Sequence, residues 1–150
     1  MDEAHENLVF VGDDINRFRG EDADDAWLRS TLALHPQAQR VAEISSINML
    51  HVAFEIGDWF LAESESQRRL VQVKRMTSVA DSCQPTYYVL ASVWDSALPE
   101  LDASGQLRVP ADQLGKERFN DCRVDLCTHL WHPLHKPCLV GTDMLYACET

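Results

Sequence analysis

The sequence predicts a mainly β protein of the α+β class, built as a small β-barrel or a twisted mixed sheet with a helical appendage at its N-terminus. Its 150 residues suffice for one domain with a sizeable core. With 45% apolar and 25% charged residues, the composition is that of an ordinary globular protein. The spacing of apolar residues changes from a helical period to a period of two near residue 44, which is typical of a helical segment followed by strands.

The N-terminal arm is predicted to span residues 1–45. An apolar run at residues 8–11 predicts a first strand, and the Gly-Asp-Asp sequence at residues 12–14 predicts a turn after it. The principal helix is expected over about residues 23–35, and a proline separates it from a second helical piece through residues 38–42. The apolar face of the principal helix carries Trp27, Leu28, Thr31, Leu32 and His35.

Residues 46–150 are predicted to form the β-rich domain. Apolar and polar side chains alternate most clearly over residues 87–94, which is typical of a half-buried strand. A single helical turn is predicted over residues 110–114, where a proline stands at the first position. The predicted strands cover residues 50–56, 59–62, 70–76, 87–94, 107–109, 123–131 and 144–148.

The charge balance restricts the partners. Thirteen Lys and Arg residues against 24 Asp and Glu residues give a formal net charge of −11. Such a surface repels nucleic acid and anionic membranes, so a basic peptide or protein partner is expected instead. The alternative is that the acidity only keeps the protein soluble. The N-terminus lacks the features of a signal peptide and no apolar run approaches the roughly 20 residues of a membrane span, which predicts an intracellular protein.

Cysteines and histidines gather near the C-terminus, and one interpretation is a zinc site. Zinc takes four such ligands in a tetrahedron, and short loops allow them to converge. The spacing contains no Cys-x2-Cys pair, so small core cysteines with surface histidines are the other interpretation, and the predicted cofactor is none or zinc. If zinc binds, Cys127 and His129 are expected among its ligands. The candidate ligands are Cys122, Cys127, His129, His132, His135 and Cys138.

No catalytic signature appears in the sequence. A nucleophile elbow, a phosphate-binding loop and a dinucleotide fingerprint are all absent. The prediction is therefore a protein without enzymatic activity. A metal-dependent hydrolase or nuclease that uses the same histidines is the alternative from another functional class.

Aromatic residues near strand ends predict a binding surface. Aromatic faces beside carboxylates suit a cationic group, methyl-lysine included. The predicted aromatic contacts are Trp59, Tyr88 and Trp94, and their anionic partners are Asp58 and Asp95. The alternative is that these rings pack in the core and cap the sheet.

Part of the chain resembles bromo-adjacent homology (BAH) domains. The run Phe-Glu-Ile-Gly-Asp-Trp-Phe-Leu at residues 54–61 is similar to the strand that opens those domains. The segment 95–100 departs from the aromatic-Pro-Glu-x-Thr run that is usual later in that family. Further similar units lie at residues 70–76, 87–94, 110–114 and 121–124, so the resemblance covers about residues 50–131.

The resemblance implies a small SH3/BAH-like β-barrel that acts in chromatin without catalysis. Domains of that family bind histone tails or partner proteins, and some use an aromatic cage for methyl-lysine. A chromatin reader that binds a histone-like basic peptide, with a nuclear location, is therefore the first functional hypothesis. Another small β-barrel of the SH3-like or tudor-like kind stays open, as does a zinc-stabilised interaction domain.

Overall fold

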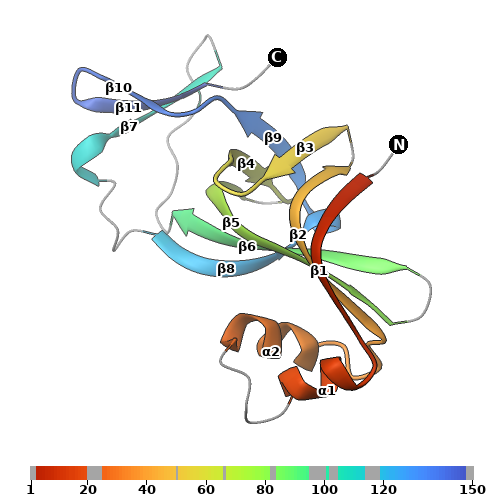
Figure 1. Cartoon of the computed structure of the whole chain (residues 1–150). Helices are drawn as coiled ribbons and strands as arrows, with labels where there is room; N and C mark the ends of the chain where they lie inside the picture. Colours follow the sequence, from red (N-terminus) through yellow and green to blue (C-terminus); the bar gives the residue numbers. More distant parts are fainter. Residues whose placement is uncertain are drawn as a thin grey trace.

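The computed structural model describes residues 3–19, 25–49, 51–65, 67–81, 84–94, 101, 105–113 and 119–147. The chain is mainly β, as predicted, with two antiparallel sheets and, in the described residues, two short α-helices (Figure 1). No closed barrel is found among the described strands. In this part of the chain, no helix combines the length and the apolar character that a membrane span requires.

The elements follow one another in the order shown in Figure 1. The helices are α1 (Asp13–Arg19) and α2 (Ala26–Ala33), with single 3-10 turns η1 (Ala111–Gln113) and η3 (Leu126–Thr128). The first six strands are β1 (Glu3–Val11), β2 (Arg40–Met49), β3 (Val52–Glu55), β4 (Trp59–Glu63), β5 (Arg68–Ala80) and β6 (Pro85–Trp94). The remaining strands are β7 (Gln106–Pro110), β8 (Phe119–Asp125), β9 (Leu130–Leu134), β10 (Cys138–Val140) and β11 (Asp143–Ala147).

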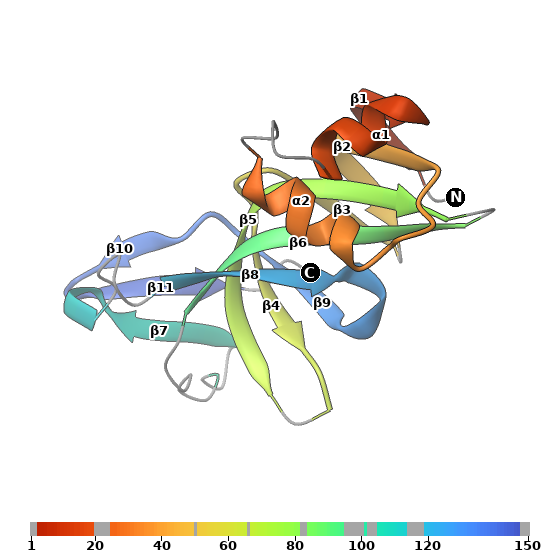
Figure 2. The same ribbon diagram turned by 90° about the horizontal axis from the view of Figure 1, so that it is seen from below.

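Strand β5 organises the larger sheet because it changes partner along its length. One of its edges pairs with β6, while on the other edge residues 68–72 pair with β4 and residues 76–80 pair with β2. A bulge between Val73 and Arg75 lies where the partner changes. Bulges bend a strand and increase its twist, and Figure 2 shows β5 curving through the middle of the sheet.

The turn between β3 and β4 is joined to β5 at this bend. The backbone N–H of Gly57 donates to the Val73 carbonyl at 2.8 Å, and the N–H of Val73 donates to the Asp58 carbonyl at 2.9 Å. Gly57 has a φ of +96°, in the left-handed region that favours glycine. The Gly-Asp pair within the run that resembles BAH domains is therefore in the turn that ties the connection between β3 and β4 to the central strand.

Three apolar clusters hold the elements together. The largest lies on one face of the larger sheet and contains the rings of Phe54, Phe60 and Trp131, whose centroids lie 4.9 to 5.6 Å apart. The second contains Trp94 and Tyr146 and joins the larger sheet to the smaller one, which has the strand order β10-β11-β7. The third packs α1 and α2 against β2, β5 and β6, and Figures 1 and 2 show the two helices together on one side of the molecule.

Polar contacts also fix α2 to the sheet. The carboxylate of Asp25 caps the helix by accepting from the N–H of Leu28 at 3.1 Å. The indole N–H of Trp27 donates to the Thr77 hydroxyl at 3.2 Å, and the Arg123 guanidinium lies 4.9 Å from the centre of the Trp27 ring. Contacts from β5 and β8 therefore converge on the first turn of α2.

Several predicted elements are observed with shifted bounds. The helix expected over about residues 23–35 is observed over Ala26–Ala33, and the turn expected over residues 110–114 is observed as η1. The first predicted strand is the C-terminal part of β1. The boundary predicted between residues 45 and 46 lies inside β2, and the division into an arm and a domain stays a prediction.

Two predictions near the N-terminus are wrong. Residues 38–42 are not a second helical piece, because β2 begins at Arg40 and pairs with both β1 and β5. This pairing buries Val41 and Ala42 on opposite faces of the sheet, and it prevails over the local helix signal that follows the proline. Residues 12–14 are not only a turn, because Asp13 begins α1.

One predicted strand is interrupted and another is shorter than predicted. Residues 123–131 are not one strand, because η3 separates β8 from β9 and directs them to different partners, β6 and β4. The strand predicted over residues 50–56 is observed as the shorter β3, because it begins only after a turn at His51, with φ of +63°. Leu50 lies outside the described residues. Alternation of side chains is the same on both sides of such a break, so the period of two does not reveal it.

Candidate functional site

A concave site among the described residues lies on one face of the larger sheet, next to the smaller sheet. Four of its residues form a row across neighbouring strands: Trp59 on β4 lies opposite Gln72 on β5, Gln72 opposite Ser92 on β6, and Ser92 opposite Asp121 on β8. Residues directly opposite one another share a face of the sheet. The row therefore brings together side chains from four segments of the chain.

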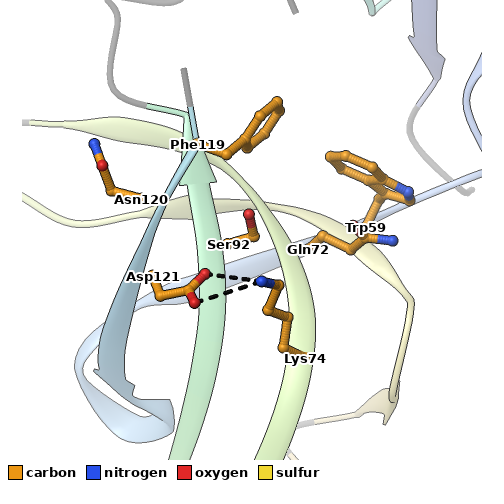
Figure 3. Close-up of a pocket in the computed structure, with 7 residues that line it drawn as sticks. All are labelled: Trp59, Gln72, Lys74, Ser92, Phe119, Asn120 and Asp121. Atoms are coloured by element: carbon orange, nitrogen blue, oxygen red, sulfur yellow. Dashed lines mark hydrogen bonds and ion pairs between the residues drawn. The ribbon is translucent and has the colours of Figure 1, made fainter. Parts of the chain in front are cut away.

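These residues belong to a pocket of about 580 Å³, which we call the Trp59 pocket. Figure 3 shows aromatic side chains on one side of it and a pair of opposite charges on the other, with Ser92 between them. The side chain of Asn120 points away from the others in this view. The lining residues are Trp59, Gln72, Lys74, Ser92, Phe119, Asn120 and Asp121.

The aromatic wall consists of Trp59 and Phe119. Their rings are in an edge-to-face arrangement with centroids 6.0 Å apart, and both side chains are half-buried. Behind them, the ring of Tyr146 on β11 lies 5.3 Å from that of Trp59. Tyr146 is buried, and burial raises the pKa of its hydroxyl to about 12. The smaller sheet thus supports Trp59 from behind and leaves part of the indole open to the pocket.

The polar wall consists of Lys74 and Asp121. The ammonium nitrogen of Lys74 lies 3.1 Å from one carboxylate oxygen of Asp121 and 3.4 Å from the other. Both side chains are about half-exposed, at 50% and 52%, and an ion pair in that setting contributes about 0–1 kcal/mol. The side-chain amide of Gln72 donates to the Gly57 carbonyl at 3.2 Å. The pocket can therefore offer a carboxylate to a cation that takes the place of Lys74.

Of the predicted aromatic contacts, Trp59 lines the pocket and Trp94 lies behind it. Trp94 is 5% exposed, packs in the same apolar cluster as Trp59, and lies opposite Phe119 on β8. Its indole nitrogen is buried and has no hydrogen-bond partner among the described residues. Trp94 thus contributes to the core beneath the pocket wall.

The structure does not bring Tyr88 to these tryptophans. Tyr88 is 9% exposed and packs in the third cluster, under the helices. Its hydroxyl lies 2.7 Å from Nε2 of His35, whose Nδ1 lies 3.2 Å from a carboxylate oxygen of Asp81. Burial, followed by the nearby charge of Asp125, raises the pKa of the Tyr88 hydroxyl.

Of the predicted anionic partners, Asp58 does not line the pocket. The Asp58 carboxylate accepts from the backbone N–H of Glu55 at 3.0 Å, as expected of an aspartate in a tight turn. Asp95 lies outside the described residues. The carboxylate that does line the pocket is Asp121, which the sequence pattern placed only in a unit similar to BAH domains.

The six candidate zinc ligands are all described, and they do not converge. His132 pairs with Glu63 at 2.9 Å, and Nδ1 of His129 lies 2.8 Å from the Thr128 hydroxyl. Among the described residues, no group of three or more His, Cys, Asp or Glu side chains could hold a metal ion. Zinc binding stays a prediction without geometric support. The remaining candidates are Cys122 (half-buried on β8), Cys127 (exposed in η3), His135 (exposed between β9 and β10) and Cys138 (exposed on β10).

Comparisons with protein-family models, with curated proteins and with solved structures gave no match for this chain. The resemblance to BAH domains therefore stays an expectation from the sequence.

Proposed function

We propose that the protein is a non-catalytic interaction module that binds a basic segment of a partner protein. One cationic side chain of that segment enters the Trp59 pocket. The observation that carries the proposal is the arrangement of Trp59 and Phe119 opposite the carboxylate of Asp121. An aromatic face and a carboxylate together attract a cation.

The expected interaction energies favour a cation over an anion in the Trp59 pocket. A cation over the face of a tryptophan gains about 0.5–1 kcal/mol when exposed and about 2 kcal/mol when desolvated. The net charge of −11 adds a long-range attraction that speeds encounter with a basic segment. An anionic guest would gain only the Lys74 ammonium and would meet the repulsion of the whole surface.

Lys74 is an internal competitor in this proposal. Its ammonium group occupies the position beside Asp121 where the guest's charge would bind. The exchange of one ammonium for another costs little, since the existing pair is half-exposed and held by a flexible side chain. The guest gains the contact with Trp59 in addition.

A histone-like tail is one basic segment that fits, and it would place the protein in the nucleus. Support for this finer proposal comes from the resemblance of residues 54–61 to BAH domains. A barrel of the BAH kind is likewise a proposal. It is supported by the bend of β5 and by the division of its edge between β2 and β4.

The test is a pair of charge-matched variants. Asp121→Asn removes the carboxylate from the pocket, whereas Asp112→Asn removes an exposed carboxylate from η1, outside the pocket and away from β1. Binding of a fluorescent lysine-rich peptide is measured by anisotropy, and thermal melts check folding. We expect Asp121→Asn to weaken binding about tenfold, or about 1.4 kcal/mol, and Asp112→Asn to change it less than twofold.

Trp59→Ala is the second arm of the test. It should also weaken binding about tenfold, and a melt that stays cooperative will show that the second cluster tolerates the change. Equal, small losses for both aspartate variants would mean that the peptide responds only to the overall charge. That result would contradict a pocket-based function.

A further inference from the structure

We infer that the outer edge of β1 is a second interaction surface. It binds an extended segment of a partner that has an apolar centre and lysine or arginine at both ends. Strand β1 ends the strand order β1-β2-β5-β4-β9, and among the described residues no strand pairs with its outer edge. Figure 1 shows β1 at the margin of the sheet. Exposed edges of this kind accept a further strand.

The C-terminal half of β1 is regular and is suited to such pairing. Residues 8–11 pair with residues 40–43 of β2 in an unbroken register. The irregularities of β1 lie before this half, between His5 and Leu8. Many natural edges are protected by lysine, by proline or by bulges, and residues 8–11 contain neither lysine nor proline.

Three apolar side chains in this half are exposed to solvent. The exposed fractions are 53% for Leu8, 40% for Val9 and 56% for Val11. Val9 lies opposite Ala42, which is fully buried in the largest cluster. The apolar face of the sheet therefore continues from β2 onto β1 and ends there exposed to water. An added strand with apolar side chains would cover it.

The charges at both ends of β1 specify the occupant. Glu3 and Glu6 lie at its beginning, Asp13 and Asp14 follow its end, and residues 3–14 contain no lysine or arginine. The surface pairs of Glu6 with Arg40 and of Asp14 with Arg17 are partly exposed and contribute little. A partner with basic residues at both ends matches these carboxylates in either strand direction.

A second copy of this chain is a poor occupant for the same reason. In a parallel pairing of two β1 strands, Glu3 would approach its own copy. In an antiparallel pairing, Glu3 and Glu6 would approach Asp13 and Asp14. Like charges across a strand pair are destabilising, and each chain brings a net charge of −11.

The test uses designed peptides and one pair of protein variants. The probe is a blocked, labelled peptide with an alternating Val-Thr-Ile-Thr-Val centre and two lysines at each end. A second peptide has glutamates in place of the lysines, and a third has a proline at its central position. We expect the lysine-flanked peptide to bind at least tenfold more tightly than either control and to slow hydrogen exchange at the alternate backbone amides of residues 8–11 that point away from β2.

Val9→Lys is the protein variant, and Leu139→Lys is its control. Leu139 is 63% exposed on β10, an edge strand of the smaller sheet. Both changes make the protein less acidic by one charge, so a general attraction for basic peptides would fall equally in both. We expect Val9→Lys to weaken binding at least tenfold and Leu139→Lys less than twofold.

Several results would overturn the inference. Among them are equal binding of the proline peptide, equal losses in the two lysine variants, and a concentration-dependent dimer in sedimentation that Val9→Lys abolishes. Loss of binding in Asp121→Asn but not in Val9→Lys would also overturn it and would assign the peptide to the Trp59 pocket. Loss of peptide binding in Val9→Lys alone supports binding at the edge of β1, whether or not the pocket proposal holds.

Discussion

At the scale of single residues, Lys74 determines how the Trp59 pocket treats a cation. We expect Lys74→Met to strengthen binding of the lysine-rich peptide about threefold to tenfold, because the guest no longer displaces an ammonium group from Asp121. The methionine keeps an apolar stem of similar length in the place of the lysine. Fluorescence anisotropy at about 0.1 M salt measures the change.

Lys136→Met is the matched control for this prediction. Lys136 is exposed outside the pocket, and its replacement makes the same change in net charge. A small gain in both variants would reflect overall charge alone. Weaker binding in Lys74→Met would mean that Lys74 itself contacts the guest, which would contradict a purely cationic guest.

The pocket residues differ in how far the sequence could predict them. Trp59 was predicted because it opens a strand directly after the Gly-Asp turn. Phe119 and Asp121 were not, because residues 119–122 precede the segment in which alternation is obvious. Their place beside Trp59 depends on the register of β8 against β6 and of β6 against β5, and no local pattern encodes a register between distant strands.

The surroundings of Tyr88 could not be predicted from the strand pattern either. The alternation along residues 87–94 gave Tyr88 and Trp94 the same face of one strand, and β6 confirms that strand. The two rings nevertheless lie in different clusters, because α1 and α2 cover one end of β6 and the smaller sheet covers the other. Which end is covered depends on tertiary packing that the strand pattern does not contain.

At the scale of elements, Asp25 links α2 to the sheet through two separate interactions. It caps the helix at the Leu28 N–H, and it accepts from Arg75 of β5 at 2.8 Å; Arg75 also binds Glu43 of β2. Asparagine is as good a cap as aspartate, whereas alanine is not. We expect Asp25→Ala to lower the free energy of unfolding by about 1 kcal/mol more than Asp25→Asn, as measured by urea denaturation at neutral pH.

Asp25→Asn should also change how the stability of the protein depends on pH. The hydrogen bond from Arg75 is the main cause that holds the pKa of Asp25 below its usual range. A carboxyl with a lowered pKa stabilises the folded state above the pKa of the unfolded chain, near 4, and loses that contribution as the pH falls through its own pKa. Stability of Asp25→Asn should therefore fall less steeply below pH 4 than that of the natural protein. Parallel curves would contradict the interaction with Arg75.

The elements themselves were predictable where local and tertiary signals agree. The strand β6 and the turn η1 arise from clear alternation and from a proline at a first turn. The prediction for residues 38–42 was wrong because their local sequence favours a helix, whereas burial between β1 and β5 favours strand β2. The break between β8 and β9 depends on Asp125, whose carboxylate accepts from the N–H of Cys127 at 2.9 Å and starts a single 3-10 turn.

At the scale of the whole molecule, the excess of acid opposes folding and favours binding at the same time. A net charge of −11 on 150 residues repels itself in the compact state. Favourable ion pairs oppose this repulsion, but those of Arg17, Arg40 and Lys74 are exposed or partly exposed and contribute about 0–1 kcal/mol each. The pairs of Arg75 are less exposed and are screened less by salt.

Salt should therefore shift stability and binding in opposite directions. Sodium chloride shortens the Debye length from about 30 Å at 0.01 M to about 10 Å at 0.1 M, so it weakens the long-range repulsion within the chain and the attraction of a basic peptide. We expect Tm to rise by a few degrees over this range while the affinity for the lysine-rich peptide falls at least severalfold. Scanning calorimetry and anisotropy in the same buffers measure both quantities. A Tm that falls with salt would mean that the surface ion pairs outweigh the net charge, and an affinity that does not change would mean that the peptide binds through apolar contacts alone.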